Sequence, residues 1–208
     1  DALTGQISIP RFENLEEEDE NIYEKSYYVN SVDDEEFYLV EDMSLPEFGG
    51  FYLEGIHALR EFEPRYQAFA SVSASQVYRW LQSRKYCGYC GTKTEKSLTE
   101  RALICPKCKY IEYPKISPAV IVAIRNGNRL LLTKNAKGVY NYYALVAGFV
   151  EVGETLEEAV AREVREEVGL KVKNIHPYKS QPWSFSDTIM LAFIADLDGD
   201  DKITLQEE

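Results

Sequence analysis

The sequence predicts a mixed protein of the α/β or α+β class, and three observations lead to that expectation. In the C-terminal half, short β-branched runs stand on both sides of one amphipathic helical segment, and strands that surround a helix give a mixed fold. Near the middle of the chain, four cysteines stand close together in two pairs. The composition, with 45% hydrophobic and 28% charged residues in a chain of 208, is that of a globular protein.

The N-terminal segment, residues 1–84, is acidic and aromatic, and we expect it to form an α+β domain. Six of the eight residues at 13–20 are carboxylic acids, which favours a solvated surface, so we assign them no chemistry. Short strand-like runs at 27–29 and 37–40 precede a helical stretch at 66–84. Five apolar side chains recur there at roughly helical spacing and predict a buried face: Phe69, Val72, Val77, Trp80 and Leu81.

All four cysteines of the chain fall between residues 87 and 108, as two C-x-x-C pairs. This spacing is typical of a four-cysteine zinc ribbon, which we expect at 85–115 with Cys87, Cys90, Cys105 and Cys108 as ligands. Two disulfides in a secreted domain are the alternative, disfavoured because no secretion signal precedes them. A zinc ion closed in by four thiolates has no open position for substrate, so we interpret this zinc as structural.

The net charge of −12 argues against a protein held to nucleic acid through its phosphates. A phosphate-bearing substrate would instead need divalent cations to offset the repulsion. No run of about 18 apolar residues predicts a membrane span, and no signal peptide is visible at the N-terminus. We therefore expect a cytoplasmic protein without membrane contact.

The C-terminal segment, residues 116–208, alternates strands with one helix. An Asn126-Gly127-Asn128 turn joins two strand-like runs into a hairpin. The helix begins with Thr155 and Glu158 at capping-box spacing and ends at Gly169, a residue suited to a left-handed helix end. The expected strands are 119–124, 129–133, 143–147, 171–175 and 188–195, with the helix at 155–168 and a loop at 148–153.

Three glutamates of this helix, Glu163, Glu166 and Glu167, are spaced i, i+3, i+4 and therefore point from one face. Like charges at this spacing destabilise an isolated helix, but hard cations bound between the carboxylates remove that cost. Mg²⁺ or Mn²⁺ fits, because both prefer oxygen ligands and keep waters that a diphosphate can replace. Glu154, just before the helix, either joins the metal ligands or holds the loop. The alternative is a surface helix rich in glutamate without chemistry.

The segment from Gly148 to Leu170, GFVEVGETLEEAVAREVREEVGL, resembles the signature of the Nudix hydrolases at every fixed position. Five residues separate Gly148 from Glu154, and seven more separate Glu154 from the Arg162 that opens REVREEVGL. The resemblance implies an α/β/α sandwich with a mixed sheet. We expect Arg162 to form a salt bridge with Glu154 and to brace the loop.

The resemblance also implies roles for individual residues. Glu166 and Glu167 are expected to ligate catalytic Mg²⁺ or Mn²⁺, and Glu163 either ligates or positions the attacking water. A further metal-site glutamate is expected downstream, and by spacing Glu208 is the best match, with Glu207 second. A Nudix domain normally continues with a strand and a helix, so we expect a truncated product. The sequence does not identify which residue acts as the general base.

A four-cysteine ribbon directly before a Nudix domain resembles the layout of the NADH pyrophosphatase family. Residues 180–188, SQPWSFSDT, are similar to that family's Ser-Gln-Pro-Trp-Pro-Phe-Pro-x-Ser motif. Ser184 and Ser186 stand where the family has prolines, so this loop is expected to be less rigid. The resemblance implies metal-dependent hydrolysis of the diphosphate bond of NAD(H), giving NMN(H) and AMP. Related enzymes also remove NAD caps from RNA ends.

The same resemblance implies a substrate site and a partner. In the family, aromatic residues sandwich the base, and the one matching Tyr113 is supplied across a homodimer interface, so we expect a homodimer. Phe185 is more consistent with core packing. The expected substrate-binding residues are Phe149, Tyr113, Trp183, Gln181 and Thr188.

Other functions remain open at this stage. The chain could be a Nudix hydrolase for ADP-ribose or another nucleoside diphosphate derivative, or a nucleotide sensor without catalysis. Intact Glu163, Glu166 and Glu167 argue against the sensor. Four acidic residues from Asp196 to Glu207 match positions of an EF-hand calcium loop, but Asp201 stands where that loop needs glycine. We interpret this stretch as a charged turn between two strands.

Overall fold

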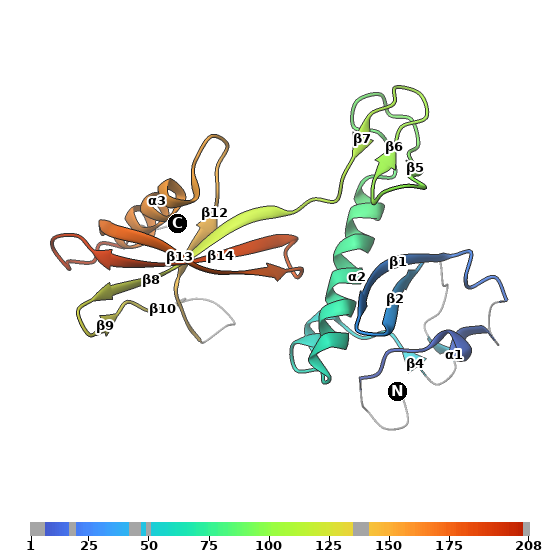
Figure 1. Cartoon of the computed structure of the whole chain (residues 1–208), viewed down its shortest axis with the longest axis horizontal. Coiled ribbons are helices and arrows are strands. Elements are labelled where there is room, and N and C mark those ends of the chain that lie inside the picture. Colours follow the sequence, from blue (N-terminus) through green and yellow to red (C-terminus); the bar gives the residue numbers. More distant parts are fainter. Residues whose placement is uncertain (1–6, 17–19, 42–46, 49–50, 135–141, 206–208) are drawn as a thin grey trace. The chain divides into compact units, whose positions relative to one another are not determined.

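The computed structural model of the chain describes residues 7–16, 20–41, 47–48, 51–134 and 142–205. Contacts within the chain divide it into two compact units, Asp1–Lys115 and Ile116–Glu208, and each is described by itself (Figure 1). None of the helices in the described residues combines the length with the apolar character that a membrane crossing requires.

In the first unit, a long helix packs on a two-stranded antiparallel hairpin, and a small three-stranded antiparallel sheet follows in the chain (Figure 1). The helix α2 extends over Arg65–Ser83, within one residue of the expected span. The other elements are α1 (Phe12–Glu16), β1 (Ser26–Val32), β2 (Glu35–Val40), β3 (Glu47–Phe48), β4 (Phe51–Tyr52), η1 (Ile56–Arg60), β5 (Glu95–Lys96), β6 (Leu103–Ile104) and β7 (Ile111–Glu112).

The buried face of α2 is confirmed for four of the five predicted side chains, and Phe69 is the exception. It is 47% exposed, because the first turns of the helix bury only the small Ala68 and Ala70. One cluster joins the helix to the hairpin and to the small sheet: Val29, Val77, Trp80, Leu81 and Leu103. Leu103 belongs to β6, so the cysteine-bearing sheet shares a hydrophobic core with the N-terminal elements.

The second unit is a mixed sheet with the order β12-β8-β14-β13, and the helix α3 packs on it (Figure 1). Strand β14 pairs with β8 in parallel, and the other pairs are antiparallel. In the described part of this unit α3 is the single helix, so the second helical layer of the expected α/β/α sandwich is not found there. The elements are β8 (Ser117–Asn126), β9 (Arg129–Leu130), β10 (Thr133–Lys134), β11 (Tyr143–Ala144), β12 (Val146–Phe149), α3 (Leu156–Val168), β13 (Val172–Trp183) and β14 (Thr188–Leu197).

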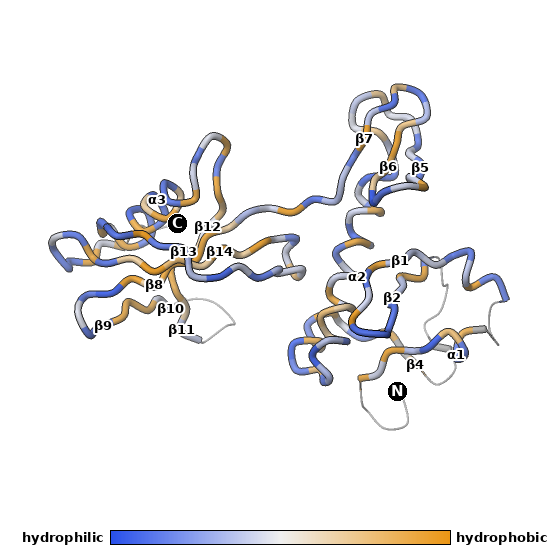
Figure 2. Tube along the Cα trace, viewed as in Figure 1, coloured by the Kyte–Doolittle hydropathy of each residue, from blue (hydrophilic) through white to orange (hydrophobic). Residues whose placement is uncertain are grey.

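An apolar core between α3 and the sheet fixes how the helix is rotated. Val160, Val164 and Val168 are at most 2% exposed, and Leu156 packs beside them at the same helical spacing. They meet Val120 and neighbouring side chains of β8, along the hydrophobic stretches in Figure 2. Burying one valine contributes about 1.5 kcal/mol or more. The glutamates between these valines are therefore held on a fixed, more exposed face.

Strand β13 is much longer than predicted. The expected strand ended at Ile175, and residues 180–188 were expected to form a loop, yet Ser180 to Trp183 pair with β14. The strand lies at the sheet edge and is mostly exposed, so its sequence lacks apolar alternation. The strand also contains Pro177 and Pro182, which an edge strand tolerates. The strand β14 precedes this acidic stretch, which confirms that no EF-hand helix comes before it. The described residues at 198–205 form no strand, so the second strand of the expected turn is not found there.

Candidate functional site

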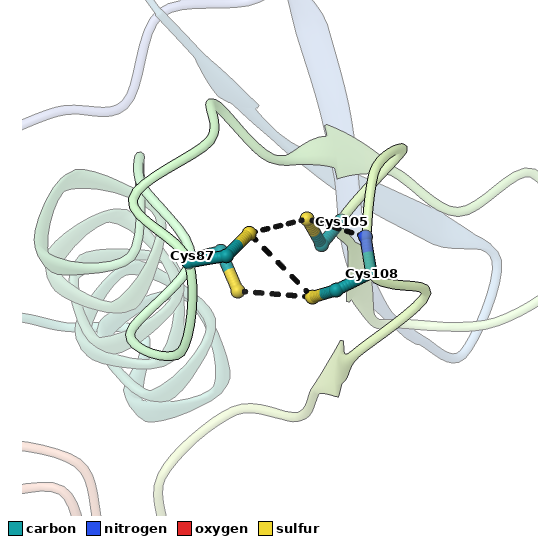
Figure 3. Close-up of side chains that lie close together, drawn as sticks. Cys87, Cys105 and Cys108 are labelled. Atoms are coloured by element: carbon teal, nitrogen blue, oxygen red, sulfur yellow. Dashed lines mark hydrogen bonds between the residues drawn. The ribbon is translucent and has the colours of Figure 1, made fainter.

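The four cysteine sulfurs of the first unit converge on one point (Figure 3). Their Sγ atoms all lie within 4.8 Å of one another, and three pairs are 3.5 to 3.6 Å apart. A tetrahedral zinc with Zn–S bonds of about 2.3 Å places sulfurs about 3.8 Å apart, so the arrangement fits the ion. A disulfide needs about 2.05 Å, and the four residues are free cysteines, so the disulfide alternative is wrong.

Two matching turns of backbone aim these sulfurs inward. The N–H of Gly91 donates to the carbonyl of Cys87 at 2.9 Å, and the N–H of Lys109 donates to that of Cys105 at 3.0 Å. Both donors have positive φ, +71° and +64°, which closes each turn tightly. Hydrogen bonds with the side chain and the backbone of Thr92 lower the pKa of the Cys90 thiol to about 6. Cys90 is thereby biased toward the thiolate, the form that ligates metal.

Helix α3 begins and ends as predicted. The N–H of Glu158 donates to the Thr155 hydroxyl at 3.2 Å, and the N–H of Thr155 donates to the Glu158 carboxylate at 2.8 Å, which completes the capping box. At the other end, Gly169 has φ +70° and its N–H donates to the carbonyl of Arg165 at 3.0 Å. These two ends fix the register in which the glutamates are presented.

The guanidinium of Arg162 uses all five of its donors on the segment around α3. It forms a two-pronged ion pair with Glu154, at 2.6 and 3.0 Å, which confirms the predicted salt bridge. It also donates to the carbonyl of Phe149 at 2.8 Å. The remaining nitrogen, Nη1, donates to Glu163 at 2.7 Å and to Glu166 at 2.9 Å, two contacts that the sequence did not predict. These carboxylates raise the pKa of Arg162, with Glu154 the largest cause.

The carboxylate of Glu163 lies directly against the backbone of β12. A Cβ at Gly148 would stand 2.0 to 2.2 Å from the three carboxylate atoms of Glu163, closer than any real contact. Only glycine fits at this position while Glu163 keeps its place. The sequence indicated Gly148 through the motif, but not this contact between a strand and a helix.

The three expected metal ligands share one helix face but differ in exposure. The side chains of Glu163 and Glu166 are 14% and 47% exposed, and Glu167 is half-buried. Within the described residues, the cysteines are the sole group of three or more potential ligands whose ligand atoms lie close together, and Glu163 and Glu166 each contact Arg162. As a set of hard oxygen donors close in sequence, the glutamates fit Mg²⁺ or Mn²⁺. Glu207 and Glu208 lie outside the described residues.

The expected substrate-binding residues occupy different environments. Phe149, at the end of β12, is 56% exposed, and Gln181 is exposed on β13. The ring of Trp183 lies 5.3 Å from that of Phe185, tilted by 51°. Tyr113, 55% exposed, belongs to the first unit.

Thr188 is the buried member of this set. It is only 4% exposed, and its hydroxyl donates to the carbonyl of Ser186 at 3.0 Å. The N–H of Ser186 in turn donates to the carbonyl of Trp183 at 3.2 Å. These contacts brace the turn between β13 and β14 where the family motif has prolines. Thr188 is therefore better suited to positioning the turn than to touching a substrate.

The ion pair between Glu154 and Arg162 predicts a specific acid sensitivity. Hydrogen bonds from Arg162, and then from the N–H of Glu151, lower the pKa of Glu154 from 4.5 to about 2. A depressed carboxyl pKa stabilises the fold above pH 4.5, and this contribution is lost as the pH falls toward about 2. Urea unfolding across that range should show a steeper loss of stability in the native chain than in Glu154→Gln. Parallel curves for the two proteins would contradict the role of this pair.

Comparisons with known proteins find matches for both the cysteine-bearing segment and the segment that contains α3. Residues 82–113 match the model of the NADH pyrophosphatase zinc ribbon domain, and residues 115–208 match that of the NUDIX domain. Among solved structures, a NUDIX hydrolase from Nitrosomonas europaea is 31% identical with a TM-score of 0.49, covering 56% of this chain and 69% of its own.

Curated relatives align over the same region. An NAD-capped RNA hydrolase NudC from Shigella dysenteriae is 49% identical over 128 residues, which is 62% of this chain and 50% of the relative. The protein of that name from Escherichia coli is 48% identical over the same length and coverage. The chain thus spans about half the length of the curated relatives it matches. The chain thus carries a zinc ribbon domain of the NADH pyrophosphatase type, followed by a NUDIX domain.

Proposed function

We propose that this chain hydrolyses the diphosphate bond of NAD(H), giving NMN(H) and AMP, and that it also removes NAD caps from RNA ends. The observation that carries the proposal is the pair of carboxylates of Glu163 and Glu166 on α3, both held by Arg162, with Glu163 against Gly148, the residue before the exposed Phe149. Relatives named NAD-capped RNA hydrolase, at 49% and 48% identity, support the choice of substrate.

In this proposal each residue has a distinct task. Glu163, Glu166 and Glu167 offer oxygen ligands to Mg²⁺ or Mn²⁺, which when bound neutralises the diphosphate and lowers the pKa of a coordinated water. Gly148 leaves space for the Glu163 carboxylate, and Arg162 holds the end of β12, where Phe149 lies. A flat aromatic ring such as Phe149 can stack on a nicotinamide or adenine ring and so orient the substrate.

The remaining expectations are part of the same proposal. The four cysteines hold a structural zinc that keeps the ribbon folded. Trp183 and Gln181 flank the substrate, and Thr188 braces the turn behind them. Tyr113 is exposed, together with Tyr110 and Ile111 near β7. In a homodimer, Tyr113 contacts the base of the substrate that is bound to the second copy. The division into domains at residues 1–84, 85–115 and 116–208 belongs to this proposal as well.

The direct test is to incubate the chain with NADH, NAD, NAD-capped RNA or ADP-ribose in the presence of Mg²⁺ or Mn²⁺. Hydrolysis is measured as the release of AMP or of 5′-monophosphate RNA. Glu167→Gln should lower the rate by about 10²- to 10⁴-fold, because it removes a charged ligand from the reacting centre. Glu157→Gln is the matched control: it is an exposed glutamate of the same helix and should leave the rate unchanged.

The outcomes separate the candidate functions. AMP from ADP-ribose but not from NADH or capped RNA would replace the proposed substrate with a nucleoside diphosphate sugar. Binding of these nucleotides without any hydrolysis would indicate a sensor. Equal rates for Glu167→Gln and the native chain would remove Glu167 from the metal site.

A further inference from the structure

The five donors of Arg162 divide into two halves with different partners. Nε and Nη2 hold the loop, through both oxygens of Glu154 and the carbonyl of Phe149. Nη1 alone holds the helix face, through one oxygen each of Glu163 and Glu166. A guanidinium has five N–H bonds, so this one has none left for another acceptor.

We propose that Arg162 is a positioning residue whose Nη1 holds one oxygen of each carboxylate offered to a catalytic cation, so that its charge competes with the cation, while its other nitrogens brace Glu154 and the end of β12. The inference rests on the proposed metal site at Glu163 and Glu166. It deepens that proposal because it gives one side chain two opposite effects: Arg162 weakens the binding of the cation and supports hydrolysis.

Charge repulsion between Glu163 and Glu166 explains why the contacts of Nη1 with these two carboxylates are needed. Glu163 and Glu166 are three residues apart on one helix face, where like charges repel. Arg162, with a side chain only 22% exposed, places a positive charge between them at hydrogen-bond distance. A cation that ligates either carboxylate removes the same repulsion, so it makes the Nη1 contact redundant, and its positive charge repels the guanidinium and weakens that contact.

The second half explains why the arginine is needed once the cation is bound. The contacts to Glu154 and to the Phe149 carbonyl involve neither Glu163 nor Glu166. They can persist when Nη1 loses its partners. Arg162 thereby keeps the end of β12 attached to the helix, and with it the ring expected to meet the base.

The competition predicts that activity and cation affinity change in opposite directions. Arg162→Gln removes the competing charge, so the apparent dissociation constant for Mn²⁺ should fall by about 5-fold or more, the lower range of coupling between sites. Hydrolysis should nevertheless fall, because the loop loses its brace. Arg162→Lys keeps the charge without the fork, so its Mn²⁺ affinity should stay near that of the native chain while hydrolysis falls.

The measurement is a titration of the full chain with Mn²⁺ in the absence of substrate. The electron paramagnetic resonance signal of the free ion reports how much Mn²⁺ stays unbound. Zinc content and thermal unfolding check that each variant is folded. Glu154→Gln is the matched control, because it weakens the other half of the guanidinium and leaves Nη1 in place; it should not tighten Mn²⁺ binding. Weaker or unchanged Mn²⁺ binding by Arg162→Gln would overturn the inference.

The outcomes distinguish this inference from the proposed function. Tighter Mn²⁺ binding by Arg162→Gln, in a chain that hydrolyses none of the four substrates, would retain the competition and reject the hydrolase. Hydrolysis by the native chain, with no gain in Mn²⁺ affinity in Arg162→Gln, would retain the hydrolase and reject the competition. Glu163→Gln should weaken Mn²⁺ binding in either case, and unchanged binding would show that the cation binds elsewhere and overturn the inference.

Discussion

Replacing Gly148 with alanine should lower hydrolysis by about 100-fold or more while leaving the fold intact. The new Cβ would stand 2.0 to 2.2 Å from the Glu163 carboxylate, so this side chain must move away. The carboxylate is the far end of a flexible side chain, so the domain accommodates the change by a rotation and not by unfolding. A displacement of about 1 Å in a reacting group costs about 100-fold in rate. Hydrolysis rates and thermal unfolding of Gly148→Ala would check both expectations.

Two controls isolate the cause. Gly55→Ala makes the same chemical change where nothing lies within 4 Å of the new Cβ, so it should alter neither rate nor stability. In a double-mutant cycle, Gly148→Ala should add little to the loss caused by Glu163→Gln, because both act on one carboxylate. Fully additive losses would mean that Gly148 matters for another reason.

Local signals predicted the part of the fold that surrounds the site. Thr155, Glu158 and Gly169 marked the two ends of α3 through contacts within a few residues of one another, so the sequence alone was sufficient. The edge strand β13 was missed beyond Ile175, because an exposed edge requires no apolar alternation and tolerates proline. Phe69 was wrongly placed in the core, since burial depends on what covers a residue as well as on its spacing.

The site itself was predicted in its composition but not in its contacts. Helical spacing placed Glu163 and Glu166 on one face, and the motif pointed to the pair of Arg162 with Glu154. The other contacts of Arg162, and the approach of Glu163 to Gly148, join a helix to a strand and a loop. Such contacts depend on how elements pack in three dimensions, and no spacing in one sequence encodes them.

The largest effect on stability is expected from removing zinc from the first unit. Structural zinc sites of this kind contribute an apparent binding free energy of about 10–16 kcal/mol, as large as the whole stability of a typical domain. Leu103, on the strand just before the second cysteine pair, lies in one core with Trp80 and Val29. Arg101 also donates a hydrogen bond to the carbonyl of Val29. Loss of the ion should therefore loosen the N-terminal elements as well as the ribbon.

Trp80 reports this event, because it is 4% exposed in the shared core. Stripping zinc with a chelator, or the substitution Cys105→Ser, should shift tryptophan emission to longer wavelength and lower the unfolding midpoint of this unit. The measurement is best made in Trp183→Phe, which leaves Trp80 as the single fluorophore of its type, with Mg²⁺ restored after chelation. If zinc leaves and the emission of Trp80 stays unchanged, the core does not depend on the ribbon. A shift would show that four thiolates hold together a core to which the N-terminal hairpin and α2 also contribute.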